Sequence, residues 1–222
     1  MLSTARAPVE PPRRLDRGIL HRAVEQIART DPALRAVVRR HGVPPLWARR
    51  PGLATLIRIV LEQQVSLASG RAVYRRMHDA LGEVTAEAIV RYGVRGLRRL
   101  GVTRQKATYC VAITEAIAGG DLSLRRVARA PVDAARAELQ RINGIGPWTA
   151  DIYLLMALRR PDIWPTGDIA LLTALQRLRR LPRRPTVEEA AGLAIRWSPW
   201  RAVAARILWH GYLAGSLRSA RA

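Results

Sequence analysis

Cysteine, lysine and phenylalanine are almost or entirely missing from this sequence. Its 222 residues include one cysteine, Cys110, one lysine, Lys106, and no phenylalanine. A single cysteine excludes a disulfide within the chain and a cysteine-ligated zinc or iron–sulfur centre, because each needs several ligands. The four histidines are scattered without metal-ligand spacing, so we expect no catalytic transition metal. Cys110 lies in an apolar helical pattern, which predicts a buried thiol.

Long apolar runs are missing as well. No uninterrupted apolar stretch approaches the roughly 18 residues that a membrane-spanning helix needs, although 49% of the residues are hydrophobic. The arginines of the first 14 residues precede no apolar segment, so they do not indicate a secretory signal. Prolines and charges in residues 1–17 predict a flexible basic tail, with order beginning near Arg17. We therefore expect a soluble protein without a membrane partner.

Acidic residues are few compared with basic ones. There are 17 acidic and 38 basic residues, which gives a formal charge of +21. A surplus of this size favours a polyanionic partner, because phosphate backbones bind basic surfaces independently of sequence. The arginines are spread along the whole chain rather than gathered on one amphipathic helix, which argues against a membrane-surface protein. Genomic base composition is an alternative explanation for arginine over lysine, but it leaves the sign of the charge unchanged.

Strand signals are absent, and apolar residues recur at helical spacing between short Gly/Pro breaks. The sequence therefore predicts an all-α fold. A proline-rich loop is expected at 42–52. Helices are expected at 19–38 with a restart at Asp31-Pro32, at 53–81 as one or two helices, and at 85–92, 95–100, 104–118, 132–141, 147–159, 169–179, 187–197 and 201–213.

The sharpest motif is the segment LQRINGIGPWTA, residues 139–150. Two helical patterns are separated by Gly144-Ile145-Gly146, and Pro147 suits the first position of the second helix. The glycines permit positive φ and a close approach of phosphate to the backbone. Free N–H groups at the hairpin and at the following helix N-terminus can bind such a phosphate. A hairpin that only packs two helices together is the alternative.

Three segments together resemble the helix-hairpin-helix (HhH-GPD) superfamily of DNA glycosylases, in its bacterial 3-methyladenine DNA glycosylase II branch. They are GIGPWTA at 144–150, WPTGD at 164–168 and RWSPWR at 196–201. The resemblance covers about residues 18–215, without the extra N-terminal domain of that branch. It implies two helical lobes that flank a central cleft.

The lobe boundaries follow from the same resemblance. Residues 18–222 would form the glycosylase unit. One lobe would span about 53–160 and contain the hairpin 139–150, and the other would combine 18–52 with 161–222.

The resemblance assigns the catalytic carboxylate to Asp168. It implies a monofunctional enzyme of base excision repair that flips and excises alkylated purines such as 3-methyladenine. A fixed anion stabilises the oxocarbenium charge that develops on the sugar while water attacks. Asp168 also suits the N-cap of the apolar helix that follows, and a helix N-terminus favours an ionised carboxylate, so the two roles are compatible. Asp151 is a weaker candidate for a direct catalytic role.

The position of the strand-cleaving lysine is occupied by tryptophan. Family members that also cleave the DNA backbone carry a lysine two residues after the second hairpin glycine, as a Schiff-base nucleophile. Here that position is Trp148. The resemblance places the single lysine, Lys106, in a stretch that shapes the helical lobe. We therefore expect base release without strand cleavage, that is, no AP-lyase activity.

Trp148 and Trp209 match positions that line the base pocket in the resembling enzyme. A flipped, cationic alkylpurine stacks well on an electron-rich indole face. Trp197 and Trp200 are expected to pack in the core. Gln64 matches the residue that fills the gap left by the flipped nucleotide; a polar turn on a solvated helix is its alternative.

The partner that the resemblance implies is double-stranded DNA containing damaged bases, bound by a monomer in the cytoplasm of a bacterium or the nucleus of a eukaryote. The only cofactor it implies is an alkali-metal ion, Na⁺ or K⁺, held by hairpin backbone carbonyls. Two other functions stay open: excision of deaminated or mismatched bases, and a non-catalytic helix-hairpin-helix DNA-binding module. The expected DNA-binding residues are Gln64, Gly144, Ile145, Gly146 and Thr149.

Overall fold

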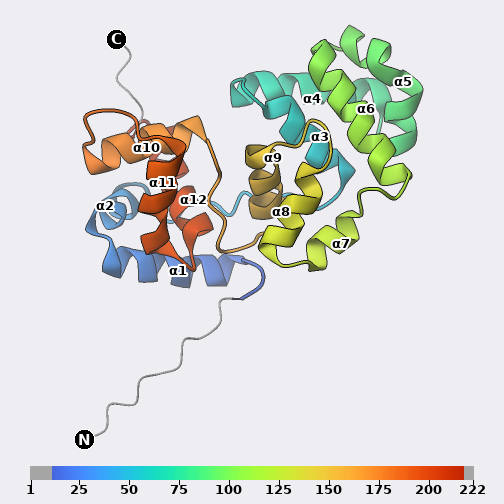
Figure 1. The fold of residues 1–222 in the computed structure, drawn as a ribbon. Coiled ribbons are helices and arrows are strands. Elements are labelled where there is room, and N and C mark those ends of the chain that lie inside the picture. Colours follow the sequence, from blue (N-terminus) through green and yellow to red (C-terminus); the bar gives the residue numbers. More distant parts are fainter. Residues whose placement is uncertain (1–11, 218–222) are drawn as a thin grey trace, which may run out of the picture.

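The computed structural model describes residues 12–217, and the regular elements among these residues are all helical (Figure 1). The all-α prediction is therefore confirmed. In chain order the elements are α1 (Arg17–Thr30), α2 (Pro32–His41), α3 (Leu53–Glu62), α4 (Leu67–Leu81), α5 (Ala86–Arg99), α6 (Arg104–Ala118), α7 (Leu124–Arg129), α8 (Val132–Gln140), α9 (Pro147–Ile152), the π-helical turn η1 (Tyr153–Ala157), α10 (Ile169–Arg179), α11 (Val187–Ala194), the 3₁₀ turn η2 (Ile195–Trp197) and α12 (Arg201–Leu213).

The helices form two groups (Figure 1). The continuous group contains α3 to α9 with η1. The discontinuous group contains α1 and α2 from the first part of the chain and α10 to α12 from the last part, and α12 packs against α1, α2 and α10. Each helix makes its main helix–helix contacts inside its own group. The segments 42–52 and 158–168 carry the chain between the groups.

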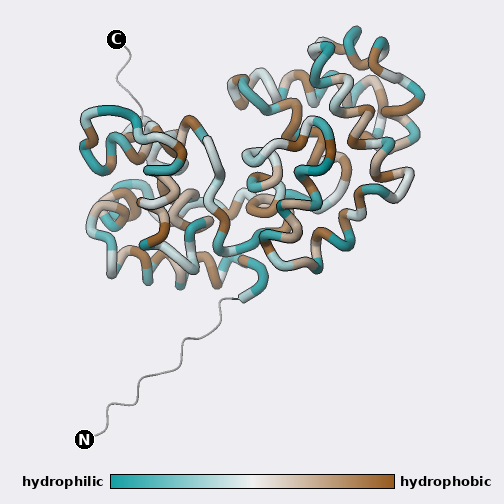
Figure 2. Tube along the Cα trace, in the orientation of Figure 1, coloured by the Kyte–Doolittle hydropathy of each residue, from teal (hydrophilic) through white to brown (hydrophobic). Residues whose placement is uncertain are grey.

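Amphipathic helices build the core of both groups. Hydrophobic and hydrophilic positions alternate along the helices (Figure 2), as expected for helices that bury one face. The exception is α12, in which nine residues from Ala202 to Gly211 are buried. A helix that is apolar nearly all round belongs in the centre of a helical cluster. Cys110 is fully buried as predicted, and burial raises the pKa of its thiol to about 12.

Local signals explain where most helices begin. Asp31, Ser66, Thr85, Thr103 and Thr186 each accept a hydrogen bond from a backbone N–H of the first turn, and Thr186 forms a capping box with the helix it precedes. The segment 53–81 is two helices with a break at residues 63–66.

The helices expected at 85–92 and 95–100 are confirmed as the two helical segments of α5, which are separated by a kink at Gly93, where φ is 56°. Two other expected helices differ in detail from the structure. The helix expected at 147–159 changes to a π-helical turn after residue 152, and the one expected at 187–197 ends in the 3₁₀ turn η2. The short helix α7 was not expected.

The N-terminal segment also departs from the prediction. Residues 1–11 lie outside the described residues, and so does most of the expected tail. Leu15 is fully buried, and its backbone N–H donates to the carbonyl oxygen of Arg159 at 2.8 Å. Order therefore begins before Arg17, because an apolar side chain preceding α1 packs into the core.

The loop 42–52 is fixed by contacts with both groups. From α12, the guanidinium of Arg206 donates to the carbonyl oxygen of Leu46 at 3.0 Å. The backbone N–H of Arg49 donates to the Met156 carbonyl oxygen at 2.9 Å, and the N–H of Gly52 donates to the Tyr153 hydroxyl at 3.1 Å. A loop without helical hydrogen bonds needs such partners for its buried backbone groups.

Asp31 joins three parts of the discontinuous group. Its carboxylate caps α2 and accepts hydrogen bonds from the Trp197 indole at 2.9 Å and from the Arg179 guanidinium. Burial works to raise the pKa of this carboxyl, but these donors outweigh it and lower the pKa below the ordinary value of 3.8. Trp197 is buried, as predicted for a core residue, whereas Trp200 is only half-buried.

Among the helices of residues 12–217, none is long and apolar enough to span a bilayer.

Candidate active site

The Asp168 carboxylate is surrounded by N–H donors. One oxygen, Oδ1, accepts from the backbone N–H of Leu171 at 2.9 Å and from the indole N–H of Trp209 at 3.1 Å. The other, Oδ2, accepts from the indole N–H of Trp148 at 2.9 Å. All three partners donate, so the arrangement fits a carboxylate anion. The N-cap role expected of Asp168 is confirmed.

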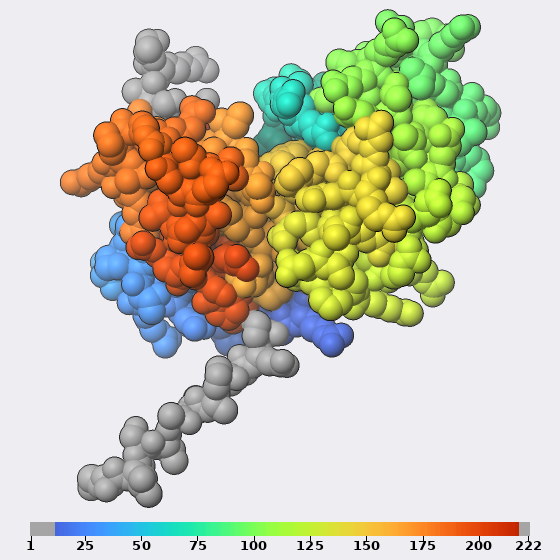
Figure 3. Space-filling view, viewed as in Figure 1, coloured from blue at the N-terminus to red at the C-terminus, as the bar shows by residue number. Residues whose placement is uncertain are grey.

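Three helices from both groups bring these side chains together. Asp168 precedes α10, Trp209 lies on α12, and Trp148 is the second residue of α9, which belongs to the continuous group. Figure 3 shows the two groups meeting along a boundary, with orange residues of the discontinuous group on one side and yellow residues of the continuous group on the other. Trp209 is buried and Trp148 and Asp168 are half-buried. The sequence predicted these residues, but not that both indoles point their N–H groups at one carboxylate.

Trp47 is a fourth member of this site that the sequence analysis missed. It lies in the loop 42–52 and its ring packs edge-on against Trp209, with ring centroids 6.4 Å apart and planes at 71°. Its φ of 46° is rare for a bulky residue. Such strain persists only where the surroundings enforce it, and Arg206 holds the preceding carbonyl, that of Leu46. A tryptophan in a proline-rich loop was the only sequence signal.

Asp151 supports the site from behind. It is fully buried on α9, and its carboxylate accepts from the Arg136 guanidinium at 2.8 Å and from the backbone N–H and the hydroxyl of Thr166 at 3.0 and 2.7 Å. These contacts fix the segment that leads to Asp168. Its engagement on all sides argues against the direct catalytic role considered for it.

The two hairpin glycines differ in their requirements. Gly144 has a φ of 93°, and a Cβ there would lie 2.4 Å from Cγ of Tyr109. Gly146 has an ordinary φ of −82°, and a Cβ there would meet no described atom within 4 Å. Of the two glycines, which both permit positive φ, only Gly144 therefore uses it. Among residues 12–217 nothing requires glycine at 146, which leaves room beside its backbone for a ligand.

Two of the expected DNA-binding residues have buried side chains. Ile145 is 3% exposed and Thr149 is 2% exposed. The Thr149 hydroxyl accepts from the Gln63 amide at 2.8 Å. Only their backbone groups remain for contact with DNA, so a contact through these two side chains is not supported. Gln64, in contrast, is exposed at the break between α3 and α4.

Lys106 lies at this same break. Its ammonium donates to the carbonyl oxygens of Leu61 at 2.9 Å and Gln63 at 2.7 Å. Burial lowers the pKa of this amine. Both contacts bind it to the end of α3.

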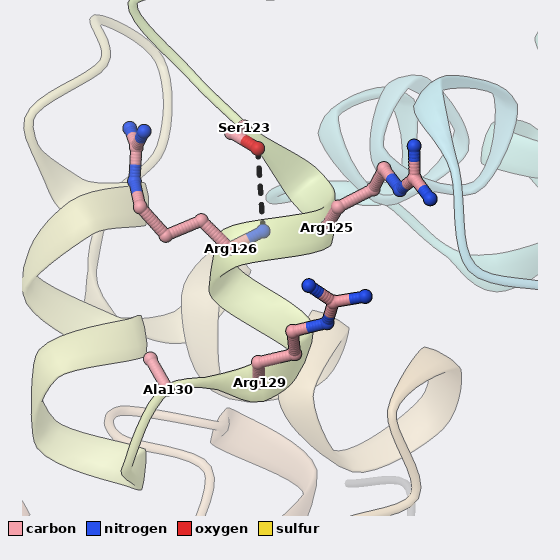
Figure 4. A pocket seen from close by; sticks show the side chains of 5 residues that line it. All are labelled: Ser123, Arg125, Arg126, Arg129 and Ala130. Carbon is pink, nitrogen blue, oxygen red and sulfur yellow. Dashed lines mark hydrogen bonds between the residues drawn. The ribbon is translucent and has the colours of Figure 1, made fainter.

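A hollow lined by arginines lies elsewhere, on α7. Its walls include Ser123, Arg125, Arg126 and Arg129. Figure 4 shows Arg125 and Arg129 directed to one side of the helix and Arg126 to the other. Arg126 pairs with Glu138 at 2.8 Å, an exposed contact of small energetic weight. The hollow therefore lies along α8, the helix that leads to the hairpin, and Arg126 reaches the last turn of that helix.

Comparison with known proteins agrees with these features. Residues 57–199 match the model of the HhH-GPD superfamily of base excision DNA repair proteins. The match covers α3 to η2, including the hairpin and Asp168. The chain belongs to this family.

Its relatives include named glycosylases. It is 28% identical over 202 residues to the DNA-3-methyladenine glycosylase of Bacillus subtilis, covering 83% of this chain and 65% of the relative. It is 32% identical over 200 residues to a probable bifunctional transcriptional activator/DNA repair enzyme AlkA of Mycobacterium tuberculosis, covering 84% of this chain and 39% of the relative. The chain thus spans less than two thirds of the length of these relatives.

Solved structures share the fold over nearly the whole chain. A DNA-3-methyladenine glycosidase from Bacillus halodurans superposes with a TM-score of 0.74 at 25% identity, covering 89% of this chain and 93% of that one. The Schizosaccharomyces pombe 3-methyladenine DNA glycosylase Mag1, in complex with abasic DNA, superposes with a TM-score of 0.76 at 23% identity, covering 90% of this chain and all of that one. The second likeness supports the fold alone.

Proposed function

We propose that this protein is a DNA glycosylase that excises alkylated purines, 3-methyladenine among them, from double-stranded DNA by hydrolysis in base excision repair. The observation that carries the proposal is the Asp168 carboxylate held by the indole N–H groups of Trp148 and Trp209. The 3-methyladenine relatives support the lesion class.

Asp168 acts as a fixed negative charge. When the bond between C1′ and the base nitrogen breaks, positive charge develops on the sugar, and the carboxylate stabilises it. The base departs with the bonding electron pair, and water then bonds to C1′ and releases a proton to the solvent. Three hydrogen bonds hold the carboxylate in place before the reaction, so little reorganisation is needed as the charge develops.

The surroundings of Asp168 favour a base that already carries positive charge. An alkylated, cationic purine leaves as a neutral molecule and needs no proton from the enzyme, whereas a neutral base needs a general acid. The hydrogen-bond partners of Asp168 among the described residues are a backbone amide and two indoles. None of these groups is an acid strong enough to protonate a leaving base. Stacking on Trp47, Trp148 or Trp209 further favours a cation.

DNA is bound by the hairpin, with Gln64 entering the duplex. The backbone N–H groups around Gly146 and at the start of α9 donate to phosphate oxygens, and the open space beside Gly146 permits the phosphate to approach. Gln64 fills the stack after the base is flipped and can hydrogen-bond the base left behind. The charge of +21 supports a polyanionic partner.

Base release occurs without strand cleavage. Trp148 occupies the position of the lysine nucleophile, and its N–H is bound to Asp168. The ammonium of Lys106 is bound to two carbonyl oxygens of the α3 end. Product DNA should therefore carry intact abasic sites that break only on alkali treatment.

The hairpin fits an alkali-metal ion. Backbone carbonyl oxygens suit a hard cation, and residues 140–145 offer several, although that of Gly144 accepts from the Gln63 amide at 3.0 Å. The family's ion, Na⁺ or K⁺, would bind to the carbonyls of this segment and add positive charge near the phosphate. It supplies no chemistry at Asp168.

Replacing Asp168 with asparagine tests the proposal. Asp168→Asn keeps the shape and removes the charge, so duplex binding should remain while excision of 3-methyladenine from methylated DNA falls by at least about a hundredfold, a typical loss for one electrostatic stabiliser. Chromatography of released bases is the measurement. If the parent releases deaminated or mismatched bases instead, the enzyme acts on a different class of lesion. If the parent releases no base, the protein is a non-catalytic DNA-binding module.

A further inference from the structure

The break between α3 and α4 holds a residue in a costly conformation. Gln64 has a φ of 52°, in the left-handed region, and its side chain is exposed. Glutamine has no special tolerance for this region, so the neighbouring residues must enforce it. We name residues 63–66 the wedge turn.

Lys106 holds the wedge turn from one side. Thr103 caps α6, which places Lys106 in the first turn of that helix, against the last turn of α3. Its ammonium donates to the carbonyl oxygens of Leu61 and Gln63, at 2.9 and 2.7 Å. These carbonyls belong to the negative end of α3, where a cation is stabilising. The second one directly precedes Gln64.

Gln63 connects the same turn to the hairpin. Its side-chain amide donates to the carbonyl oxygen of Gly144 at 3.0 Å and to the hydroxyl of Thr149 at 2.8 Å. One hydrogen bond reaches the hairpin itself, and the other reaches the first turn of α9. Both acceptors are in the motif that would bind DNA phosphate.

We propose that Lys106 and Gln63 are positioning residues that lock the wedge turn to the hairpin, so that Gln64 is driven into the duplex when the hairpin engages phosphate. The inference rests on the proposed function. It explains why the single lysine of an arginine-rich chain occupies this place: a compact ammonium with three donors can bridge two adjacent carbonyls, whereas guanidinium is a wide planar fork.

Loss of the ammonium should weaken base flipping more than phosphate binding. In Lys106→Met the carbonyls of Leu61 and Gln63 lose their donor. The wedge turn can then change conformation when Gln64 is pressed into the base stack. Excision of 3-methyladenine from a normal pair should fall about tenfold, the rate equivalent of one hydrogen bond to a charged group. Excision of the same lesion from single-stranded DNA, where nothing needs to be wedged out, should change less than about threefold.

The controls separate positioning from folding. Gln63→Leu removes both amide contacts and should also lower the ratio of the excision rate on paired DNA to that on single-stranded DNA. Arg91→Met removes one exposed charge from α5 and should leave this ratio unchanged. Equal losses on both substrates, or an unchanged ratio in Lys106→Met, would overturn the inference.

Base extrusion can also be followed without chemistry. The fluorescence of 2-aminopurine placed beside the lesion increases when the base stack opens. On protein binding, this fluorescence should rise less with the double variant Asp168→Asn, Lys106→Met than with Asp168→Asn alone. An equal rise contradicts the inference even if the parent releases no base. Absence of base release by the parent would contradict the proposed function alone.

Discussion

The Asp168 carboxylate is held by residues that lie far apart in the chain. Trp148 precedes Asp168 by 20 residues and Trp209 follows it by 41, and the ring of Trp47 packs against Trp209. The family resemblance points to Asp168 and both indoles, but it does not reveal that the two indoles donate to one carboxylate or that Trp47 lies beside them. Trp47 comes from a loop far away in sequence, and only tertiary packing brings it near.

The two hairpin glycines should respond differently to alanine. Gly146→Ala should fold like the parent, since its Cβ meets nothing within 4 Å, but bind damaged and undamaged duplexes about tenfold more weakly because the methyl obstructs phosphate. Fluorescence anisotropy measures the affinities. Undiminished affinity would mean that the hairpin does not anchor DNA.

Gly144→Ala is the counterpart. Its Cβ would press on Tyr109 at 2.4 Å and its φ is 93°. The free energy of unfolding should fall by more than about 1 kcal/mol, as when alanine is forced into a conformation it disfavours. Thermal denaturation distinguishes this loss from the binding defect of Gly146→Ala.

Asp31 should make stability depend on pH. Asp31→Asn leaves Arg179 without its charged partner and should cost about 3 kcal/mol at neutral pH, as for a broken buried ion pair. Because the folded pKa of Asp31 is lowered, its contribution is present above pH 3.8 and is lost as the pH falls through the folded pKa. The difference in the free energy of unfolding between the parent and Asp31→Asn, measured by urea denaturation, should therefore become smaller at acid pH.

The control for Asp31 is the exposed Asp79. Asp79→Asn should change the free energy of unfolding by less than about 0.5 kcal/mol. If the difference in the free energy of unfolding between the parent and Asp31→Asn stays constant across the acid range, protonation of Asp31 does not control stability.

At the level of elements, capped helices were predictable and irregular ones were not. The helix expected at 104–118 matches α6 because Thr103 and the residues after it give a clear start and a long apolar pattern. The short helix α7 is rich in arginine and has one buried residue, Val127, which is too little periodicity to detect. The π-helical turn η1 depends on tertiary contacts such as those of Tyr153.

The loop 42–52 should depend on one buried cation. Arg206 is fully buried and donates to the carbonyl oxygens of Leu46, Leu155 and Ala202. Burial lowers the pKa of its guanidinium to about 9. Arg206→Met leaves these acceptors unpaired, so the protein should lose about 3 kcal/mol.

The consequence for Trp47 can be measured separately. If Arg206 holds the loop, limited proteolysis of Arg206→Met should cut within 42–52 faster than in the parent, while the exposed Arg196→Met should behave as the parent. Unaltered cleavage of the loop would show that its other contacts suffice.

Across the whole molecule, net charge alone does not identify which arginines meet DNA. Arg141 lies in the hairpin motif, whereas Arg125 lies on α7 in the hollow, outside that motif. Salt at physiological concentration screens charges beyond about 8 Å. Arg141, exposed in the hairpin, should therefore contribute to DNA affinity, and Arg125 in the hollow should not.

Salt titrations test this assignment. Arg141→Gln should reduce the slope of log affinity against log salt by about 0.9, the loss of one phosphate contact, whereas Arg125→Gln should leave it unchanged. Equal slopes for the two variants would contradict the placement of DNA at the hairpin.

The order of the helices along the chain has a consequence for synthesis on the ribosome. α1 and α2 emerge first, yet their packing partners α10 and α12 emerge last. The continuous group between them finds its helix partners within its own span and can fold as it leaves the exit tunnel. The nascent chain must therefore keep the faces of α1 and α2 that pack against α12 uncovered until α12 has been translated.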